Sequence, residues 1–93
     1  MINFLIKYAC LIPVEKFDFV HNDSFVTYHK NVKITIPVDK TVIYFEFDGE
    51  QIEIKADSEE FMKFRGKLIN ELNKKLNIGY DKLLEKIYNQ LLQ

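Results

Sequence analysis

The chain has 93 residues, of which 47% are hydrophobic and 29% are charged, and its net charge is −1 at pH 7. We expect one domain over residues 1–93, with a strand-rich sheet in 1–56 and helices in 57–93, because neither half alone could bury a sufficient core. The balanced charge argues against broad electrostatic binding to duplex nucleic acid, which requires a concentrated basic surface.

The cysteine content and the N-terminal segment bear on the cellular environment. Cys10 is the only cysteine, which excludes an intrachain disulfide and a cysteine-based zinc site. The apolar run MINFLIKYACLIPV is interrupted by Lys7 and has no basic region before it, so it fits neither a membrane span nor a secretory signal. A lone thiol suits a reducing compartment. The sequence therefore predicts a cytoplasmic protein without a membrane association.

Residues 2–12 are apolar at both alternating sets of positions. This pattern favours a strand that is covered on both faces and ended by Pro13. A short helix is the alternative, because periodicity does not separate a buried strand from a helix in so apolar a run.

A series of short strands follows. FDFVH and FVTYH are separated by the turn-forming Asn22, Asp23 and Ser24, and VKITIPV comes next. The strongest hairpin signal is YFEFDGEQIEIK, in which Asp48 and Gly49 predict a two-residue type I′ turn.

That turn sets the strand register. It pairs Phe45 with Ile52 on one face and Tyr44 with Glu53 on the other. An even-length loop before the hairpin then pairs Thr35 with Tyr44, because a slip of one residue would invert the strand. The predicted meander has one apolar face and one polar face.

The helical pattern begins after the hairpin. Asp57 and Glu60 form a capping-box pattern, and apolar residues then recur at helical spacing from Phe61 to Leu76. We predict a helix end and turn at 77–79 and a second helix over 80–92. The predicted fold class is α+β, with an antiparallel β-meander of about four to six strands followed by two C-terminal helices packed on one sheet face.

No group of residues indicates catalysis, a cofactor or a metal site. The acidic residues of the hairpin lie on a solvated face with lysines beside them, where no pocket raises a pKa. His21 and His29 are expected ~13 Å apart along a hairpin, too far to share one ion. Cys10 lies in an apolar segment, which is typical of an inert buried thiol. We therefore predict a protein that is not an enzyme and has no catalytic residues, cofactor or metal.

Two features of the helices are unusual. Arg65 falls inside the apolar stripe of the first helix; it could extend beside the second helix, pair with a carboxylate such as Glu50, or contact a partner. The last helix has an apolar arc of roughly 180°, wider than packing on one core requires, mainly through Tyr88 and Leu92. The N-terminal segment or another chain, a second copy included, is expected to cover the excess, and exposure by chance is the third alternative.

The predicted function is protein binding by a small interaction module. Its small size and a composition typical of AT-rich genomes favour an accessory protein of a phage or mobile element, such as an inhibitor of a host defence complex. The alternative is a nucleic-acid-associated protein that uses the basic residues of the first helix and aromatic residues of the sheet. The partner is another protein of unknown identity, and a homodimer through the last helix is one form of this prediction. The predicted partner-binding residues are Tyr28, Thr35, Tyr44, Glu46, Glu53, Arg65, Tyr88 and Leu92.

Overall fold

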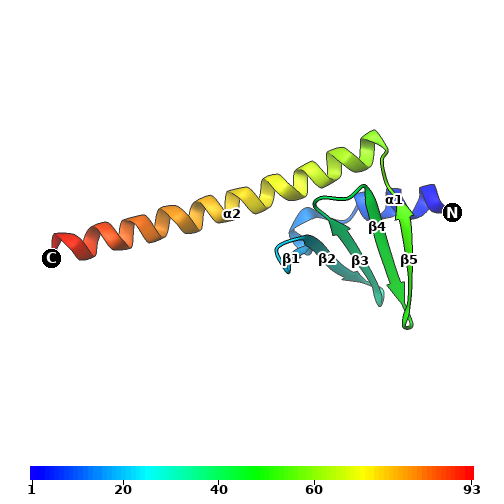
Figure 1. Ribbon diagram of the computed structural model, residues 1–93, viewed down its shortest axis with the longest axis horizontal. Helices are drawn as coiled ribbons and strands as arrows, with labels where there is room; N and C mark the ends of the chain where they lie inside the picture. Colours follow the sequence, from blue (N-terminus) through cyan, green and yellow to red (C-terminus); the bar gives the residue numbers. More distant parts are fainter.

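The computed structural model describes all 93 residues and has an α+β fold with a five-stranded sheet and two α-helices (Figure 1). In chain order the elements are α1 (Ile2–Cys10), a 3-10 helix η1 (Val14–Lys16), strands β1 (Asp18–Val20), β2 (Ser24–His29), β3 (Val32–Pro37), β4 (Val42–Phe47) and β5 (Glu50–Lys55), and α2 (Glu59–Leu92).

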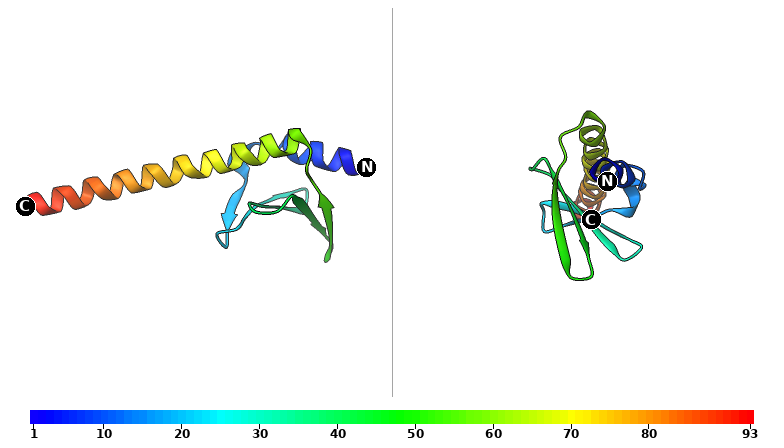
Figure 2. Two further views of the ribbon diagram at one scale, coloured as in Figure 1. Left: turned by 45° about the horizontal axis from the view of Figure 1, so that its top comes forward. Right: turned by 90° about the vertical axis from the view of Figure 1, so that its right-hand side faces the viewer.

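The sheet is an antiparallel meander in which each strand pairs with its neighbour along the chain. Figure 2 shows α1 and the beginning of α2 on one side of the sheet, whereas the other side is open. We call the covered side the inner face and the open side the outer face. The inner face carries Phe25, Thr27, Ile34, Ile36, Ile43, Phe45, Ile52 and Ile54, and the outer face carries Tyr28, Lys33, Thr35, Tyr44, Glu46 and Glu53.

The predicted β4–β5 hairpin is confirmed. Asp48 and Gly49 both have positive φ, 54° and 79°, as a type I′ turn requires. Tyr44 pairs with Glu53 and Phe45 with Ile52, in the predicted register. Asparagine, aspartate and glycine adopt positive φ at low cost, so this short turn fixes the faces of both strands.

The predicted pairing of the preceding strand is also confirmed. Thr35 lies opposite Tyr44 and Lys33 lies opposite Glu46. The even-length loop gives this register, and only this register puts the Ile and Phe side chains of neighbouring strands on the same buried face.

Residues 2–12 contradict the predicted strand and form the alternative, a helix, over most of their length. Leu5, Tyr8 and Ala9 follow the i, i+3, i+4 spacing of one helix face, and Ile12 lies two residues beyond the end of α1. Ala9 and Ile12 are buried, and Leu5 and Tyr8 pack against the core. The strand prediction failed because the other side of this segment is also apolar, and its Ile2 and Phe4 remain exposed.

The two predicted C-terminal helices are a single helix, α2. The turn expected at 77–79 is absent, because one glycine in a helix costs only about 1 kcal/mol and no neighbouring element draws the chain back at this point. The capping residue also differs: the Ser58 hydroxyl, and not the Asp57 carboxylate, accepts a hydrogen bond from the Phe61 N–H at 3.2 Å. The expected packing of a second helix on the sheet is therefore wrong.

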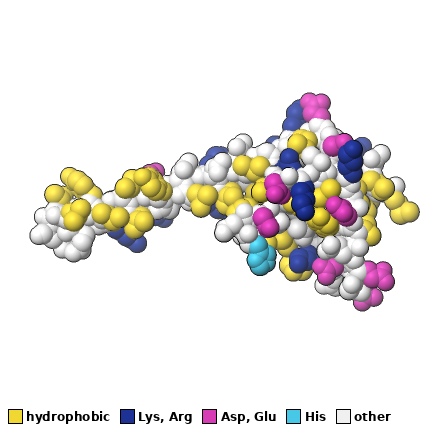
Figure 3. All heavy atoms as spheres, in the orientation of Figure 1, with side chains coloured by type: hydrophobic (Ala, Val, Ile, Leu, Met, Phe, Trp, Pro, Cys, Tyr) yellow, Lys and Arg dark blue, Asp and Glu magenta, His cyan; other side chains and the backbone are white.

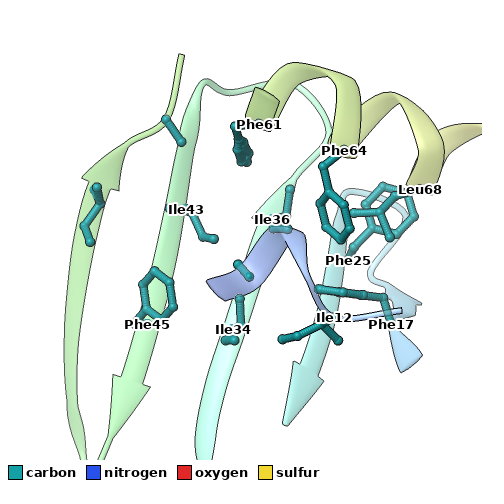
Figure 4. Close-up of a cluster of buried hydrophobic side chains, with 13 residues drawn as sticks. Ile12, Phe17, Phe25, Ile34, Ile36, Ile43, Phe45, Phe61, Phe64 and Leu68 are labelled. Carbon is teal, nitrogen blue, oxygen red and sulfur yellow. The ribbon is translucent and has the colours of Figure 1, made fainter. Parts of the chain in front are cut away.

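The core lies between the inner face and the two helices. Figure 4 shows Phe61, Phe64 and Leu68 pointing from α2 toward the strands. These three side chains are at most 6% exposed, and the Phe64 ring meets the Phe17 ring edge-on at 5.7 Å. Thr27 is the only buried polar residue, and no buried side-chain nitrogen or oxygen lacks a hydrogen-bond partner.

The core assignment predicts a contrast between two isoleucines. Ile43 is 0% exposed and Ile78 is 54% exposed. We expect Ile43→Ala to lower the free energy of unfolding by about 2–5 kcal/mol, because it leaves a cavity. The matched change Ile78→Ala should shift it by no more than about 0.5 kcal/mol. Urea denaturation followed by circular dichroism measures both values, and equal losses would contradict this description of the core.

Candidate interaction surfaces

The most unusual surface of the molecule is the C-terminal part of α2, which extends away from the sheet (Figure 1). The molecule measures 61 by 29 by 20 Å, and this helix accounts for the long dimension. Ile69 and Leu72 are half-buried at the edge of the core, and every residue from 73 to 93 is exposed. We call residues 73–93 the C-terminal arm.

The arm is strongly amphipathic. At 100° per residue, its main apolar side chains fall within an arc of roughly 140°. Figure 3 shows hydrophobic side chains gathered along the arm, far from the core. The charged residues lie on the opposite side of the helix, and Ile78 and Leu92 are the large apolar residues among them. The apolar arc consists of Leu76, Tyr80, Leu83, Leu84, Ile87, Tyr88 and Leu91, each between 48% and 81% exposed.

An arm of this kind is marginal as an isolated helix. Helices in proteins gain most of their stability by packing an amphipathic face and only a minor part from intrinsic propensity. Gly79 lowers helix stability further, by about 1 kcal/mol relative to alanine. Contiguous exposed apolar surface is uncommon in monomeric soluble proteins and marks interaction sites. The arm therefore has the properties of a segment that packs against another surface.

The structure excludes one of the two covers expected for Tyr88 and Leu92. The N-terminal segment does not reach them, because α1 contacts the beginning of α2. Tyr88 remains 64% exposed and Leu92 68% exposed. Tyr88 lies at the edge of the apolar arc, and Leu92 lies beyond that edge, so neither is at its centre. The structure therefore excludes the N-terminal segment as the cover, and a cover by another chain stays a prediction.

The outer face of the sheet is the second candidate surface. The strand register brings Tyr28, Thr35, Tyr44, Glu46 and Glu53 onto this one face, as expected. The Tyr44 hydroxyl donates a hydrogen bond to a Glu53 carboxylate oxygen at 3.3 Å, and Tyr28 is 69% exposed.

The charge on this face is mixed. Lys33 pairs across the strands with Tyr28 on one side and with Glu46 on the other. The carboxylates are therefore interspersed with a lysine and with tyrosines, and the face is an amphipathic surface without a concentrated acidic site.

Arg65 has a structural contact that the sequence did not indicate. Its guanidinium donates a hydrogen bond to the backbone carbonyl of Lys40, in the loop between β3 and β4. The expected pair with Glu50 is wrong, because Glu50 lies at the exposed tip of the β4–β5 hairpin. The prediction that the Arg65 side chain extends beside a second helix is also wrong, because α2 is continuous and no second helix follows it. Arg65 instead ties the first turns of α2 to the sheet, and its predicted partner contact stays a prediction.

The side chains considered for chemistry lie apart from one another. Cys10 is half-buried on α1, not in a strand. Burial, with a smaller effect from the negative charge of Glu60, raises the pKa of its thiol from the ordinary 9.0 to about 11. The His29 ring packs edge-on against Tyr8 at 5.4 Å. No three histidine, cysteine or acidic side chains gather as metal ligands would.

The largest hollow on the surface is open and has a volume of about 620 Å³. It lies between the end of α1 and strands β1 and β2, and Lys16, Asp18 and His29 are among its lining residues. No hydrogen bond or ion pair links these three side chains to one another. The hollow therefore has no paired nucleophile and base.

Sequence reasoning missed the arm as one surface, although a signal was present. Leu76, Tyr80, Leu83, Ile87 and Leu91 recur at intervals of three and four residues. This periodicity crosses Gly79 without a change of phase, which favours a continuous helix over a turn.

Comparisons with protein-family models, with curated proteins and with solved structures found no match for this chain. None of its helices combines the length and the apolar character needed to cross a membrane.

The environment of Cys10 predicts slow alkylation. A pKa of about 11 makes the thiolate about 100-fold scarcer at pH 8 than for a thiol of pKa 9.0. We expect iodoacetamide to modify the folded chain about that much more slowly than the urea-unfolded chain. Because the folded-state pKa is the higher one, this thiol stabilises the fold below pH 9.0 and the contribution is lost as the pH rises toward 11.

Two controls accompany this measurement. Glu60→Gln should lower the pKa of Cys10 only partly, because burial is the larger cause of the shift. Equal alkylation rates in the folded and unfolded chains would show that the thiol is not protected.

Proposed function

We propose that this chain is a non-enzymatic protein-interaction module whose principal binding element is the C-terminal arm. The observation that carries the proposal is the continuous apolar arc on the C-terminal arm, in which every residue is exposed. An amphipathic helix that lays its apolar face on another protein is a recurrent mode of recognition.

The arm offers enough apolar surface for specific binding. Seven large side chains form the arc, and full burial of each is worth about 1.5–3 kcal/mol. A partner must also offset the loss of translational freedom and the ordering of the arm, which together cost ~4–15 kcal/mol or more. The gain from burying seven such side chains, ~10–20 kcal/mol, is of the same order as that cost. Tyr80 and Tyr88 are of the residue type that most often dominates interface energies.

The outer face of the sheet is proposed as a secondary contact surface. Tyr28 stands exposed on it, and Tyr44 lies half-buried beside Glu53. Aromatic side chains among polar neighbours are typical of interface anchors. Thr35 and Glu46 complete this surface, and Arg65 lies on the helix side of the sheet, where it supports the fold.

We further propose that the module acts in the cytoplasm as an accessory protein of a phage or mobile element, for instance by inhibiting a host defence complex. The support comes from the small size of the chain, from an amino-acid composition typical of AT-rich genomes, and from the lack of a recognisable group of catalytic residues in the sequence. A homodimer through the last helix is a second form of the same binding function.

Site-specific photo-crosslinking tests the proposed function. A photoreactive phenylalanine analogue replaces Tyr88 in the apolar arc, Tyr28 on the outer face, or Asn89 on the opposite side of the arm. In cells that express each variant, position 88 should give a defined crosslinked protein, either another protein or the chain itself, and position 89 should give little. Position 28 should give a weaker product. If position 88 yields no more product than position 89, the arm is not a binding element.

The nucleic-acid alternative predicted from the sequence has weaker support. On α2, the Lys63 ammonium lies 3.3 Å from a carboxylate oxygen of Glu59, and the Lys74 ammonium lies 3.7 Å from one of Glu71. These pairs reduce the positive charge available for phosphates.

A gel-retardation series distinguishes this alternative. We expect no retardation of single- or double-stranded DNA or RNA even at low salt. Binding that is tight at low salt and falls steeply as salt rises would instead support the nucleic-acid function, because counterion release has this signature.

A further inference from the structure

We infer that the C-terminal arm pairs with the arm of a second copy of this chain in an antiparallel arrangement, with the two-fold axis between Leu83 and Leu84. This inference rests on the proposed function and names the partner of the same surface. It is carried by the order of the apolar residues, by the position of the exposed segment and by the area available.

The sequence of the arm is self-complementary about this axis. An antiparallel pair centred between Leu83 and Leu84 brings the apolar residues of the two copies to the same heights. Leu76 then lies level with Leu91 of the second copy, and Tyr80 lies level with Ile87. Leu83 and Leu84 meet their counterparts on either side of the axis. Each of the five resulting layers contains only leucine, isoleucine or tyrosine.

The angular positions agree with these layers. The six residues that form the layers are distributed about one line on the helix surface that runs parallel to the helix axis. At 100° per residue, Leu76, Tyr80, Ile87 and Leu91 lie within about 30° of this line. Leu83 and Leu84 flank it on opposite sides, by roughly 50° each. The layers therefore form along one line of contact, as two packed helices require.

A parallel pair lacks this complementarity. In a parallel pair in register, each residue lies level with the same residue of the second copy, so Tyr80 would stack on Tyr80. The two helix dipoles would also be aligned, which is unfavourable. Antiparallel pairing mixes a tyrosine with an isoleucine in two layers and opposes the dipoles.

The exposed part of α2 coincides with the part that would be covered. Exposure is continuous over 73–93, whose midpoint is close to the proposed axis. Residue 92 of one copy would lie level with residue 75 of the other, three residues from Leu72 at the edge of that copy's core. The pairing therefore covers almost the whole arm and stops before the sheet of either copy. At the rise of an α-helix, the two cores would lie roughly 35 Å apart along the helix axis.

The buried area would be sufficient for a stable interface. Burial of one large apolar side chain removes roughly 60–120 Å² of apolar surface from water. The six side chains of the layers on each arm give on the order of 700–1,400 Å² in the pair, which overlaps the ~1,200–2,000 Å² of specific protein interfaces. The value lies at the lower end, so the dimer should dissociate on dilution.

Light scattering coupled to size-exclusion chromatography tests the pairing with a matched pair of variants. Leu83→Glu puts a carboxylate beside the two-fold axis in both copies, whereas Asn89→Glu adds the same charge on the opposite side of the arm. At high concentration, wild type and Asn89→Glu should have twice the chain mass of 11.1 kDa. Leu83→Glu should have the mass of one chain. A monomeric wild type, or a dimeric Leu83→Glu, would overturn the inference.

Spin-label distances test the orientation. Lys75 and Lys82 are seven residues apart on one side of the helix, and each is replaced by a labelled cysteine in a Cys10→Ala chain. Antiparallel pairing separates the two labels along the axis by about 25 Å at position 75 but only about 5 Å at position 82. Equal distances at the two positions would show a parallel pair and overturn the proposed register.

The two proposals can fail separately. A monomeric wild type that still crosslinks a different protein from position 88 would overturn self-pairing and leave the protein-binding function intact. A dimer whose mass is unchanged by Leu83→Glu would show that the copies associate through another surface, which would overturn self-pairing of the arm. If position 88 also gave no crosslinked product, the arm would not bind another protein either.

Discussion

The packing of the first three turns of α2 on the inner face of the sheet determines the rest of the structure. Phe61, Phe64 and Leu68 are almost completely buried there, together with Ile36 and Ile43 of the strands. A meander alone would leave its apolar face in water, and α1 alone is too short to cover it. The sheet has a core only because α2 covers its inner face. The Ser58 cap fixes where α2 begins, and the contact of Arg65 with the β3–β4 loop fixes how the helix lies on the sheet.

The same packing explains why the arm is free. The sheet is only as wide as five strands, and α2, at ~1.5 Å per residue, is far longer than the surface it covers. Beyond Leu72 the helix has no sheet beneath it, yet its apolar residues continue. A helix that served only the core would become polar at that point. The continuation of large apolar side chains where no core remains to be covered is the physical basis of the proposed binding function.

The sheet was largely predictable from the sequence, whereas the helices were only partly predictable. The Asp48-Gly49 turn and the period-two pattern left one acceptable register, so the faces of β3, β4 and β5 followed without tertiary information. The residues of the outer face were grouped correctly for the same reason. For residues 2–12 the hydrophobic pattern did not distinguish a helix from a strand, because leucine and isoleucine on both sides of a segment fit either one. Contacts with distant residues, such as those of α2, favour the helix. The Arg65 contact with a backbone carbonyl was not predictable, since a carbonyl is present at every position of the chain.

The pairing of two arms would change what the outer face can do. The two sheets would lie at opposite ends of the antiparallel helix pair, so the assembly would present two copies of the surface that carries Tyr28 and Tyr44. Two weak contacts on one rigid spacer bind a partner with matching spacing far more tightly than either contact alone, because the second contact forms at high effective concentration. The arm and the outer face would then act together: the arm would set the distance between the two surfaces, and the sheet would supply the contacts. The length of the arm would in that case be a determinant of specificity, since it would select partners whose binding sites are repeated at the same spacing.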